Sequence, residues 1–392
     1  MNFKDEAQKL QKLLVQYRRD FHSEPELPLM EYNTCGKIKR FLAENNIEIL
    51  PSGQETSVVG IIRGARPGKT IGLRADIDAL PITEAVESPY KSKTEGVMHA
   101  CGHDAHSAML MGAALLLNSM KKDLKGCIKL IFQAAEEIGV GALNLVKADV
   151  LEGVDAVMGF HINMDIETGK VGFKSGYSQA SASTLKIVIT GAGGHGAFPH
   201  KTNDPITAGC YLVTELQTIV SRMLDPVQPA VITIGSFQGG TKENIIPEKV
   251  DICGTIRTFS NEVSTLISTK IADVCRATEL VFGCKCEFTI TTGCPPVFNN
   301  PQFVKEFARS ASVEIVSEEN VIDIDIPAMV GDDMAFYLEK VPGVLGALGV
   351  RNAAKGITAG NHTAQFDLDE ESLWVGTACL AQTAWDFLAA AK

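Results

Sequence analysis

The sequence has no excess of positive charge and no long apolar run, two features that would indicate particular partners. It has no excess of positive charge, because 47 acidic residues against 36 basic ones give a formal net charge of −11. A nucleic-acid-binding surface needs a basic face. Its longest uninterrupted apolar runs, such as residues 108–117, are too short to span a bilayer. We therefore expect neither nucleic acid nor a membrane as a partner.

Cysteine is present, but not in a pattern that indicates disulfides. The ten cysteines are scattered along the chain, and only Cys284, Cys286 and Cys294 lie close together. No export signal is visible at the N-terminus, so we expect reduced thiols and a cytoplasmic protein. The cysteine trio has two interpretations, a second metal site or three buried thiols in a strand and its turn. Buried thiols are the more common case.

The residues that are present describe a globular α/β protein. Hydrophobic residues make up 45% of the chain and charged residues 21%, and 392 residues suffice for two domains. Four apolar runs rich in β-branched residues are bounded by glycine, proline or charge, at residues 57–63, 70–76, 126–133 and 155–161. Helical stretches separate several of them, including a buried helix over residues 107–118. This alternation predicts a mixed, mainly parallel sheet flanked by helices.

From residue 183 onward the pattern changes to that of a smaller domain. The predicted elements are a strand at 184–190, a helix at 205–223, strands at 230–237 and 249–259, a helix at 262–279 and a strand at 286–291. This β-α-β-β-α-β order is typical of a ferredoxin-like unit. We expect residues 181–294 to form an inserted domain between the two segments of the first, residues 1–180 and 295–392. The second segment is predicted to end in a helix over residues 370–391.

The most informative segment is residues 98–106, with the sequence MHACGHDAH. It holds a thiol, three imidazoles and a carboxylate in nine residues, and this density of soft and borderline ligands suits a divalent transition metal. Further donors follow in a pair, Glu136 and Glu137, and in His161 and His362. Together they suggest one metal site.

The predicted strands explain how donors so far apart in sequence can meet. Asp76 and Asp78 close the second predicted strand, the glutamate pair closes the third, and His161 closes the fourth. Open α/β folds place active sites at the carboxyl ends of their sheet strands. Cys101 and His103 are expected in a loop just before the buried helix, facing the same edge.

The adjacent glutamates suit hydrolysis. Neighbouring side chains in a turn point apart, so one can bind a metal while the other faces the substrate. We assign Glu137 as a ligand and Glu136 as the general base that takes a proton from a metal-activated water and returns it to a leaving amine. Ligand types leave the metal open between Zn, Mn, Ni and Co.

A competing motif lies in the inserted domain. Residues 191–196, GAGGHG, follow a predicted strand and satisfy the G-x-G-x-x-G pattern of dinucleotide-binding folds. That pattern needs a helix to begin within the motif, but Pro199 sits where its first turns should run. The acidic residue expected about 20 positions later would be Glu215, inside a helix. A nucleotide-dependent oxidoreductase is therefore the weaker alternative.

Taken together, the motifs resemble those of the aminoacylase-like di-metal amidohydrolases. The resemblance is to the branch of hippurate hydrolases, indoleacetyl-amino-acid hydrolases and N-acetyl amino acid deacetylases. It covers nearly the whole chain. The matching motifs are RDFH at 19–22, PEL at 25–27, GLRADIDALP at 72–81, MHACGHDAH at 98–106, Glu136-Glu137, His161, GGH at 193–195 with PH at 199–200, NIIP at 244–247, GTIR at 254–257, and His362.

The resemblance implies a catalytic domain that holds two divalent metal ions and is interrupted by a lid domain that mediates dimer contacts. It implies a function, the hydrolysis of the amide bond of N-acyl amino acids. A catalytically weak member of the fold that binds acylated amino acids or metal is the alternative. The ligands of the metal centre would be Cys101, His103, Glu137, His161 and His362.

The remaining roles are also carried over from the resemblance. Glu136 would be the general base, and Asp76 would orient a ligand from behind. His195 would polarise the scissile carbonyl, in relatives often at the neighbouring subunit's site. Asn244 and Arg257 would hold the substrate carboxylate, a task that suits a guanidinium group.

Overall fold

The computed structural model describes residues 1–390, and the chain divides into two compact units. Unit 1 consists of Met1–Ser178, Val297–Pro327 and the residues from Asp332 on; unit 2 consists of Gln179–Pro296 and Ala328–Gly331. Residue 391, the predicted last residue of the final helix, lies outside the described residues. Among those residues no helix is both long and apolar enough to cross a membrane.

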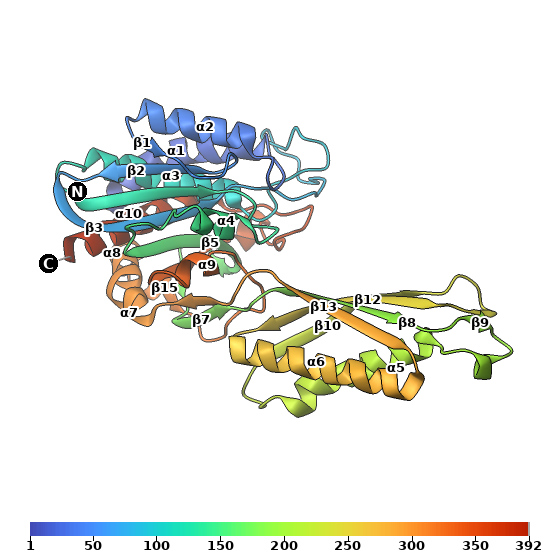
Figure 1. The fold of residues 1–392 in the computed structure, drawn as a ribbon. Coiled ribbons are helices and arrows are strands. Elements are labelled where there is room, and N and C mark those ends of the chain that lie inside the picture. The colour runs from blue at the N-terminus through green and yellow to red at the C-terminus, as the bar shows by residue number, and fades with distance from the viewer. Residues whose placement is uncertain (391–392) are drawn as a thin grey trace. The chain divides into compact units, whose positions relative to one another are not determined.

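Unit 1 is built on an eight-stranded mixed sheet with the order β1-β2-β4-β3-β5-β16-β6-β15 (Figure 1). Its four central strands, β4, β3, β5 and β16, run parallel to one another. The predicted α/β class with a mainly parallel sheet is confirmed. The strands are β1 (Glu48–Leu50), β2 (Val58–Arg63), β3 (Arg66–Asp76), β4 (Lys125–Gln133), β5 (Ala156–Glu167), β6 (Val171–Phe173), β15 (Val321–Asp323) and β16 (Gly343–Arg351). A separate pair joins β7 (Gly176–Gln179) to β14 (Val297–Asn299).

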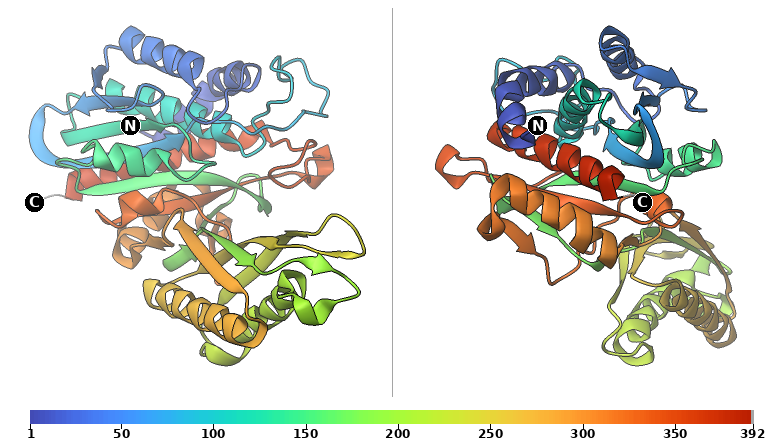
Figure 2. Two further views of the ribbon diagram at one scale, coloured as in Figure 1. Left: turned by 45° about the vertical axis from the view of Figure 1, so that its right-hand side comes forward. Right: turned by 90° about the vertical axis from the view of Figure 1, so that its left-hand side faces the viewer.

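Helices cover both faces of this sheet. Helices α3 and α10 pack against β3 and α1 packs on both of them, while α4 packs against β4 with α9 beside it; Figure 2 shows α10 and α4 on opposite faces. Helix α3 is apolar on nearly all sides and almost wholly buried, as expected for a central helix. The helices are α1 (Phe3–His22), α2 (Tyr32–Glu44), α3 (His103–Ser119), α4 (Gly141–Lys147), α7 (Pro301–Phe303), α8 (Ser310–Val316), α9 (Ala335–Leu338) and α10 (Leu373–Ala390).

Unit 2 is a four-stranded antiparallel sheet with the order β10-β12-β8-β13 and two helices. Alternate residues of β8 and β12 are buried against α5 and α6, so one face of the sheet forms the core of this unit and the other stays open. The elements are β8 (Ser183–Thr190), β9 (Gly194–His195), α5 (Pro205–Thr218) with a π-helical turn at Ile219–Met223, β10 (Ala230–Gly239), β11 (Ile245–Ile246), β12 (Lys249–Thr258), α6 (Asn261–Phe282) and β13 (Lys285–Thr292).

Two predictions about local structure were wrong. His161 does not close a strand, because β5 continues to Glu167. Strand β3 stops pairing with β5 at Gly159, but β16 pairs with it further and keeps it extended. His103 is not in a loop but is the first residue of α3. The first turn of α3 carries the buried polar residues His103, Asp104 and His106, which pair with other buried polar side chains. Without apolar residues at helical spacing, the sequence gives no sign that the helix begins there.

Candidate metal centre

Three central elements of unit 1 bring the predicted donors to one edge of the sheet. Strand β3 ends at Asp76, the turn after β4 carries Glu136 and Glu137, and β5 carries His161. Because these strands are parallel, the turns after β3 and β4 meet at the same edge. Strands β3 and β5 and the turn after β4 therefore place one imidazole and three carboxylates close together.

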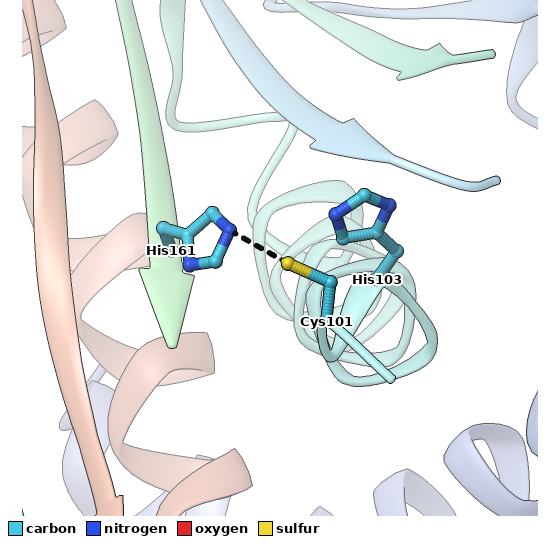
Figure 3. Close-up of side chains that lie close together, drawn as sticks. All are labelled: Cys101, His103 and His161. Atoms are coloured by element: carbon cyan, nitrogen blue, oxygen red, sulfur yellow. Dashed lines mark hydrogen bonds between the residues drawn. The ribbon is translucent and has the colours of Figure 1, made fainter. Parts of the chain in front are cut away.

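The segment before α3 adds a thiol and a second imidazole, separated by one glycine. Gly102 has φ +83°, a left-handed conformation, and a Cβ there would lie 2.6 Å from the side chain of Ile162. Glycine is thus required by both backbone and space. The sharp turn brings Cys101 and His103 to the same region as His161, where the Cys101 Sγ lies 3.5 Å from the His161 Nε2 (Figure 3).

Hydrogen bonds fix the orientation of both imidazoles. The Nδ1 of His103 is 3.1 Å from an oxygen of Asp78, and the Nδ1 of His161 donates to the backbone carbonyl of Ile162 at 2.7 Å. In each ring the Nε2 faces the cluster. This arrangement, with one nitrogen held from behind, is typical of metal-binding histidines.

His362 reaches the same cluster from the opposite end of the chain. Its backbone N–H donates to the carbonyl of Ala100 at 2.8 Å, and its φ of +61° is a left-handed conformation that few non-glycine residues adopt. Its Nε2 lies 3.3 Å from the Cys101 Sγ and 3.4 Å from a Glu137 oxygen. Such local strain is commonly retained where function needs it.

The donor atoms form overlapping groups, each small enough to surround one ion. Within each of the following groups the potential ligand atoms lie within 4.8 Å of one another: Cys101 with His103 and His161, Cys101 with Glu137 and His362, and His103 with Glu136 and Glu137. Cys101 therefore belongs to two of the three groups.

Within residues 1–390, the buried Nε2 of His103 and Oε1 of Glu137 meet no atom in hydrogen-bonding geometry. Buried polar groups are almost always paired, and these two atoms lie 3.8 Å apart. A cation would satisfy both. The donor set thus fits divalent metal ions, with the five predicted ligands brought together in unit 1.

The electrostatics of the cluster favour the ionised thiol. Burial raises the pKa of Cys101, but His161 and hydrogen bonds from the surrounding imidazoles outweigh it and lower the pKa to about 6. The thiolate is the form that binds metal. The same holds for Glu137, because burial raises its pKa while the nearby imidazoles of His362, His103 and His161 lower it below the usual range.

Glu136 stands in a different environment from its neighbour. One of its oxygens is 4.0 Å from the His103 Nε2, and on its other side it groups with Asp332 and Asp333. Burial and these two carboxylates raise its pKa well above the usual range. A carboxyl with high proton affinity beside a cation site is suited to general base and acid chemistry.

Sequence reasoning named Asp76 as a supporting residue but gave no role to Asp78. Asp78 lies 3.1 Å from the Nδ1 of His103, while Asp76 binds the Nδ1 of His106 and has an oxygen 3.7 Å from the Nε2 of His103. The Nε2 of His106 accepts from the backbone N–H of Ile162 at 2.9 Å, so this imidazole braces the strand and is not free as a ligand. The Asp-x-Asp spacing was the available signal, since alternate residues leaving a strand share one side.

A buried ion-pair network lies behind Glu136. Arg74 is almost fully buried and pairs with Asp76 at 2.8 Å, Asp333 at 2.9 Å and Asp332 at 3.3 Å. Asp332 and Asp333 are more than 250 residues distant from Arg74 in sequence, and no local pattern connects them. Only the folded sheet shows this network.

The remaining predicted residues, His195, Asn244 and Arg257, lie in unit 2. His195 is exposed on β9, which pairs with β11 so that His195 lies opposite Ile245, next to the exposed Asn244. The N–H of Ala197 donates to the Nδ1 of His195 at 3.1 Å. In the neutral ring the proton must then be on Nε2, which is free to donate to a ligand.

Arg257 lies far from His195 within the same unit. The β9–β11 pair is at one end of the unit (Figure 1), beside the start of β12 at Lys249. Arg257 is near the other end of β12, eight residue steps away. At about 3.3 Å a step, that is roughly 26 Å, too far for both side chains of one chain to touch the same small molecule.

Two alternatives raised by the sequence fail in the structure. After Gly191 comes the short strand β9, and α5 begins only at Pro205, so no helix starts within the G-x-G-x-x-G motif to receive a pyrophosphate. Cys284, Cys286 and Cys294 are buried, and within residues 1–390 none of them belongs to a cluster of potential metal ligands.

Comparisons with known proteins were made for the whole chain. The model of peptidase family M20/M25/M40 matches residues 72–386. An N-acetyl-L-cysteine deacetylase of Bacillus subtilis is 40% identical over 370 residues, 93% of this chain and 85% of the relative. A thermostable carboxypeptidase 1 of Saccharolobus solfataricus is 38% identical and covers 98% of both chains. A Bacillus subtilis crystal structure, described as a dinuclear metal binding peptidase of the M20 family, has a TM-score of 0.85 and 35% identity, with 98% of this chain and 99% of that chain covered.

Proposed function

This chain belongs to peptidase family M20/M25/M40, whose members are metal-dependent amidohydrolases, and from that premise we propose that it hydrolyses the amide bond of N-acyl amino acids. The observation that carries the proposal is the pairing of Glu136 and Glu137, one beside two carboxylates and the other beside two imidazoles. The names of the relatives support the substrate class. A deacetylase and a carboxypeptidase both cleave an amide whose nitrogen belongs to an amino acid with a free carboxylate.

The proposed metal ligands are Cys101, His103, Glu137, His161 and His362, with Asp78 holding His103 and Asp76 acting through His106. Two divalent ions bound there would acidify a water molecule and polarise the amide carbonyl. Their identity stays open between Zn, Mn, Ni and Co, because one thiolate among imidazoles and carboxylates suits all four.

Glu136 then moves the protons. Its raised proton affinity lets it accept a proton from the attacking water, hold it at a carboxyl oxygen, and deliver it to the departing amine. His195, with its proton on Nε2, donates to the oxygen of the carbonyl as negative charge develops there. Arg257 and Asn244 are the proposed contacts to the substrate carboxylate; because Asn244 lies next to His195 and far from Arg257, the two would come from different chains.

We further propose that unit 2 is a lid and that the active form is a homodimer. The separation along β12 supports this proposal, since His195 and Arg257 of one chain cannot reach the same substrate. If two copies exchange their β9–β11 ends, each site receives Arg257 from its own chain and His195 from the partner.

The test of the function is the Glu136→Gln variant. We expect hydrolysis of a panel of N-acetyl and N-benzoyl amino acids and short peptides to fall about 100- to 10,000-fold, with the metal content unchanged. The matched control is Glu137→Gln, in which metal and turnover are lost together. Near-normal turnover by Glu136→Gln would refute its role. Absence of hydrolysis by the wild type with each of Zn, Mn, Ni and Co would favour a binding protein.

A further inference from the structure

The turn that carries Glu136 and Glu137 is held by side chains from four separate parts of the chain. The N–H groups of Ala134, Ala135, Glu137 and Ala142 donate, respectively, to Ser57 Oγ (3.0 Å), Glu31 Oε1 (2.9 Å), Asp78 Oδ2 (3.0 Å) and Asp333 Oδ2 (2.9 Å). We call residues 134–142 the glutamate turn. Its shape is therefore fixed by acceptors outside it as well as by its own backbone bonds.

One residue of the glutamate turn has an unusual backbone. Ala135 has φ +55°, and left-handed geometry costs an L-residue with a Cβ free energy that glycine does not pay. Ala135 immediately precedes Glu136, so its conformation sets the direction in which the two carboxylates leave the backbone. Something must hold Ala135 in this conformation.

Glu31 is in place to do so. It is fully buried, its Oε1 accepts the Ala135 N–H, and its Oε2 has no hydrogen-bond partner. No lysine or arginine within residues 1–390 forms an ion pair with it. Burying a carboxyl group that has no ion pair and one unbonded oxygen costs free energy. We take this cost as an indication that the hydrogen bond to Ala135 matters for function.

Helix capping does not explain Glu31. It stands at the N-cap of α2, but its side chain makes no capping hydrogen bond. That task belongs to Glu26, whose carboxylate accepts the N–H groups of Asn33 and Thr34 at 2.9 and 2.8 Å. The same short segment thus holds two carboxyls, one serving the helix and one serving the glutamate turn.

We propose that Glu31 is a positioning residue for the reaction, holding Ala135 in its left-handed conformation so that Glu136 and Glu137 point to their separate tasks. This inference rests on the proposed function for its kinetic consequence. Its structural consequence is independent of any substrate.

Four variants test the proposal: Glu31→Ala, Glu31→Gln, Glu26→Ala as the matched control, and the double variant Glu31→Ala with Ala135→Gly. Three quantities are measured in each: the hydrogen-exchange rate of the Ala135 amide, the affinity for added Mn²⁺ or Zn²⁺, and kcat and KM for N-acetyl amino acids. Thermal unfolding monitors stability alongside them.

We expect Glu31→Ala to speed exchange of the Ala135 amide at least about tenfold, because a buried hydrogen bond is lost. Metal affinity should fall about tenfold and kcat about 10- to 100-fold, with KM little changed. Glu31→Gln should stay within about threefold of wild type, because its amide oxygen still accepts the N–H. Glu26→Ala should lower the unfolding temperature and leave kcat unchanged.

The double variant is the sharpest measurement. Glycine adopts positive φ without the Cβ penalty, so Ala135→Gly should restore part of the kcat lost in Glu31→Ala, about fivefold. Equal exchange, metal affinity and kcat in Glu31→Ala and Glu26→Ala would overturn the proposal, as would a double variant no better than Glu31→Ala. If instead the wild type hydrolyses none of the panel, the function fails, while exchange and metal affinity still decide the role of Glu31.

Discussion

The metal centre of unit 1 and the β9–β11 end of unit 2 differ in how their side chains are held. In the centre, the Nδ1 of His103 and that of His161 are each paired, and the donors lie in a buried turn, a helix start and a strand. At the β9–β11 end, His195 and Asn244 are exposed, and the imidazole of His195 contacts near neighbours in its own segment, the N–H of Ala197 and the ring of Phe198.

This difference in how the side chains are held indicates which part of the site is complete within a single unit. A buried centre with its ligands oriented in advance needs only ions and water to be complete. The exposed side chain of His195 is free for a further contact, which we propose that a substrate or a partner subunit provides. We therefore expect changes to the proposed metal ligands of unit 1 to act through metal binding, and changes at the β9–β11 end to act on turnover alone.

Cys101→Ser gives the largest expected effect. The thiolate belongs to two groups of potential metal ligands, one with His103 and His161 and one with Glu137 and His362, and serine is a poor ligand for soft or borderline metals. Loss of the ions removes several kcal/mol of charge stabilisation, so kcat/KM should fall more than about a thousandfold. Metal analysis and steady-state kinetics measure the effect, with Cys127→Ser, a half-buried thiol on β4, as the control. A metal-free Cys101→Ser protein with normal turnover would show that turnover does not depend on metal bound in unit 1.

His195→Ala is expected to act next most strongly and in a different way. Loss of one oxyanion donor costs about 100- to 1,000-fold in kcat, while metal content and unfolding temperature should match the wild type. His200→Ala, another exposed histidine close by, is the control. If His195→Ala lost its ions, the two regions would not be independent.

Mixing two inactive variants tests whether His195 serves the partner's site. Equal amounts of Glu136→Gln and His195→Ala chains, allowed to exchange subunits, would form mixed dimers in which one site has both residues intact. Random pairing then restores about a quarter of wild-type activity. No recovery after verified exchange would place His195 and Glu136 in the same chain's site.

Asp78→Asn is expected to have the smallest effect of the set. Asparagine keeps the size of the side chain but weakens the hydrogen bond that orients His103, and loss of such support costs about 10- to 100-fold in metal affinity. Turnover at saturating metal should be nearly normal. Chelator competition measures the affinity, and a variant that binds metal as tightly as the wild type would show that Asp78 does not orient the ligand.

Structural features that depend on residues close together in the sequence were predicted better than those that depend on distant residues. The apolar runs gave β2, β3 and β4 to within a few residues, because alternation and β-branching act locally. The dense MHACGHDAH segment marked Cys101 and His103 for the same reason. His161 was predicted as a ligand from its place near a strand end, but its actual position in the middle of β5 was not, since pairing with β16 extends that strand.

The supporting residues were beyond local reasoning. Arg74 meets Asp333 across 259 residues, and Glu31 meets Ala135 across 104. Neither contact leaves a periodicity or a spacing in the sequence. Such partners are set by how the sheet brings distant turns together, and a single sequence does not contain that signal in readable form.

The central claim is that Cys101, His103, Glu137, His161 and His362 hold two divalent ions while Glu136 works beside them. Elemental analysis of the purified wild-type, Cys101→Ser and Glu136→Gln proteins, each after metal loading and removal of unbound metal, tests it directly. We expect two ions per chain in the wild type and in Glu136→Gln, and fewer in Cys101→Ser. Full metal content in Cys101→Ser, or a wild type that hydrolyses its substrate without any ion, would contradict it.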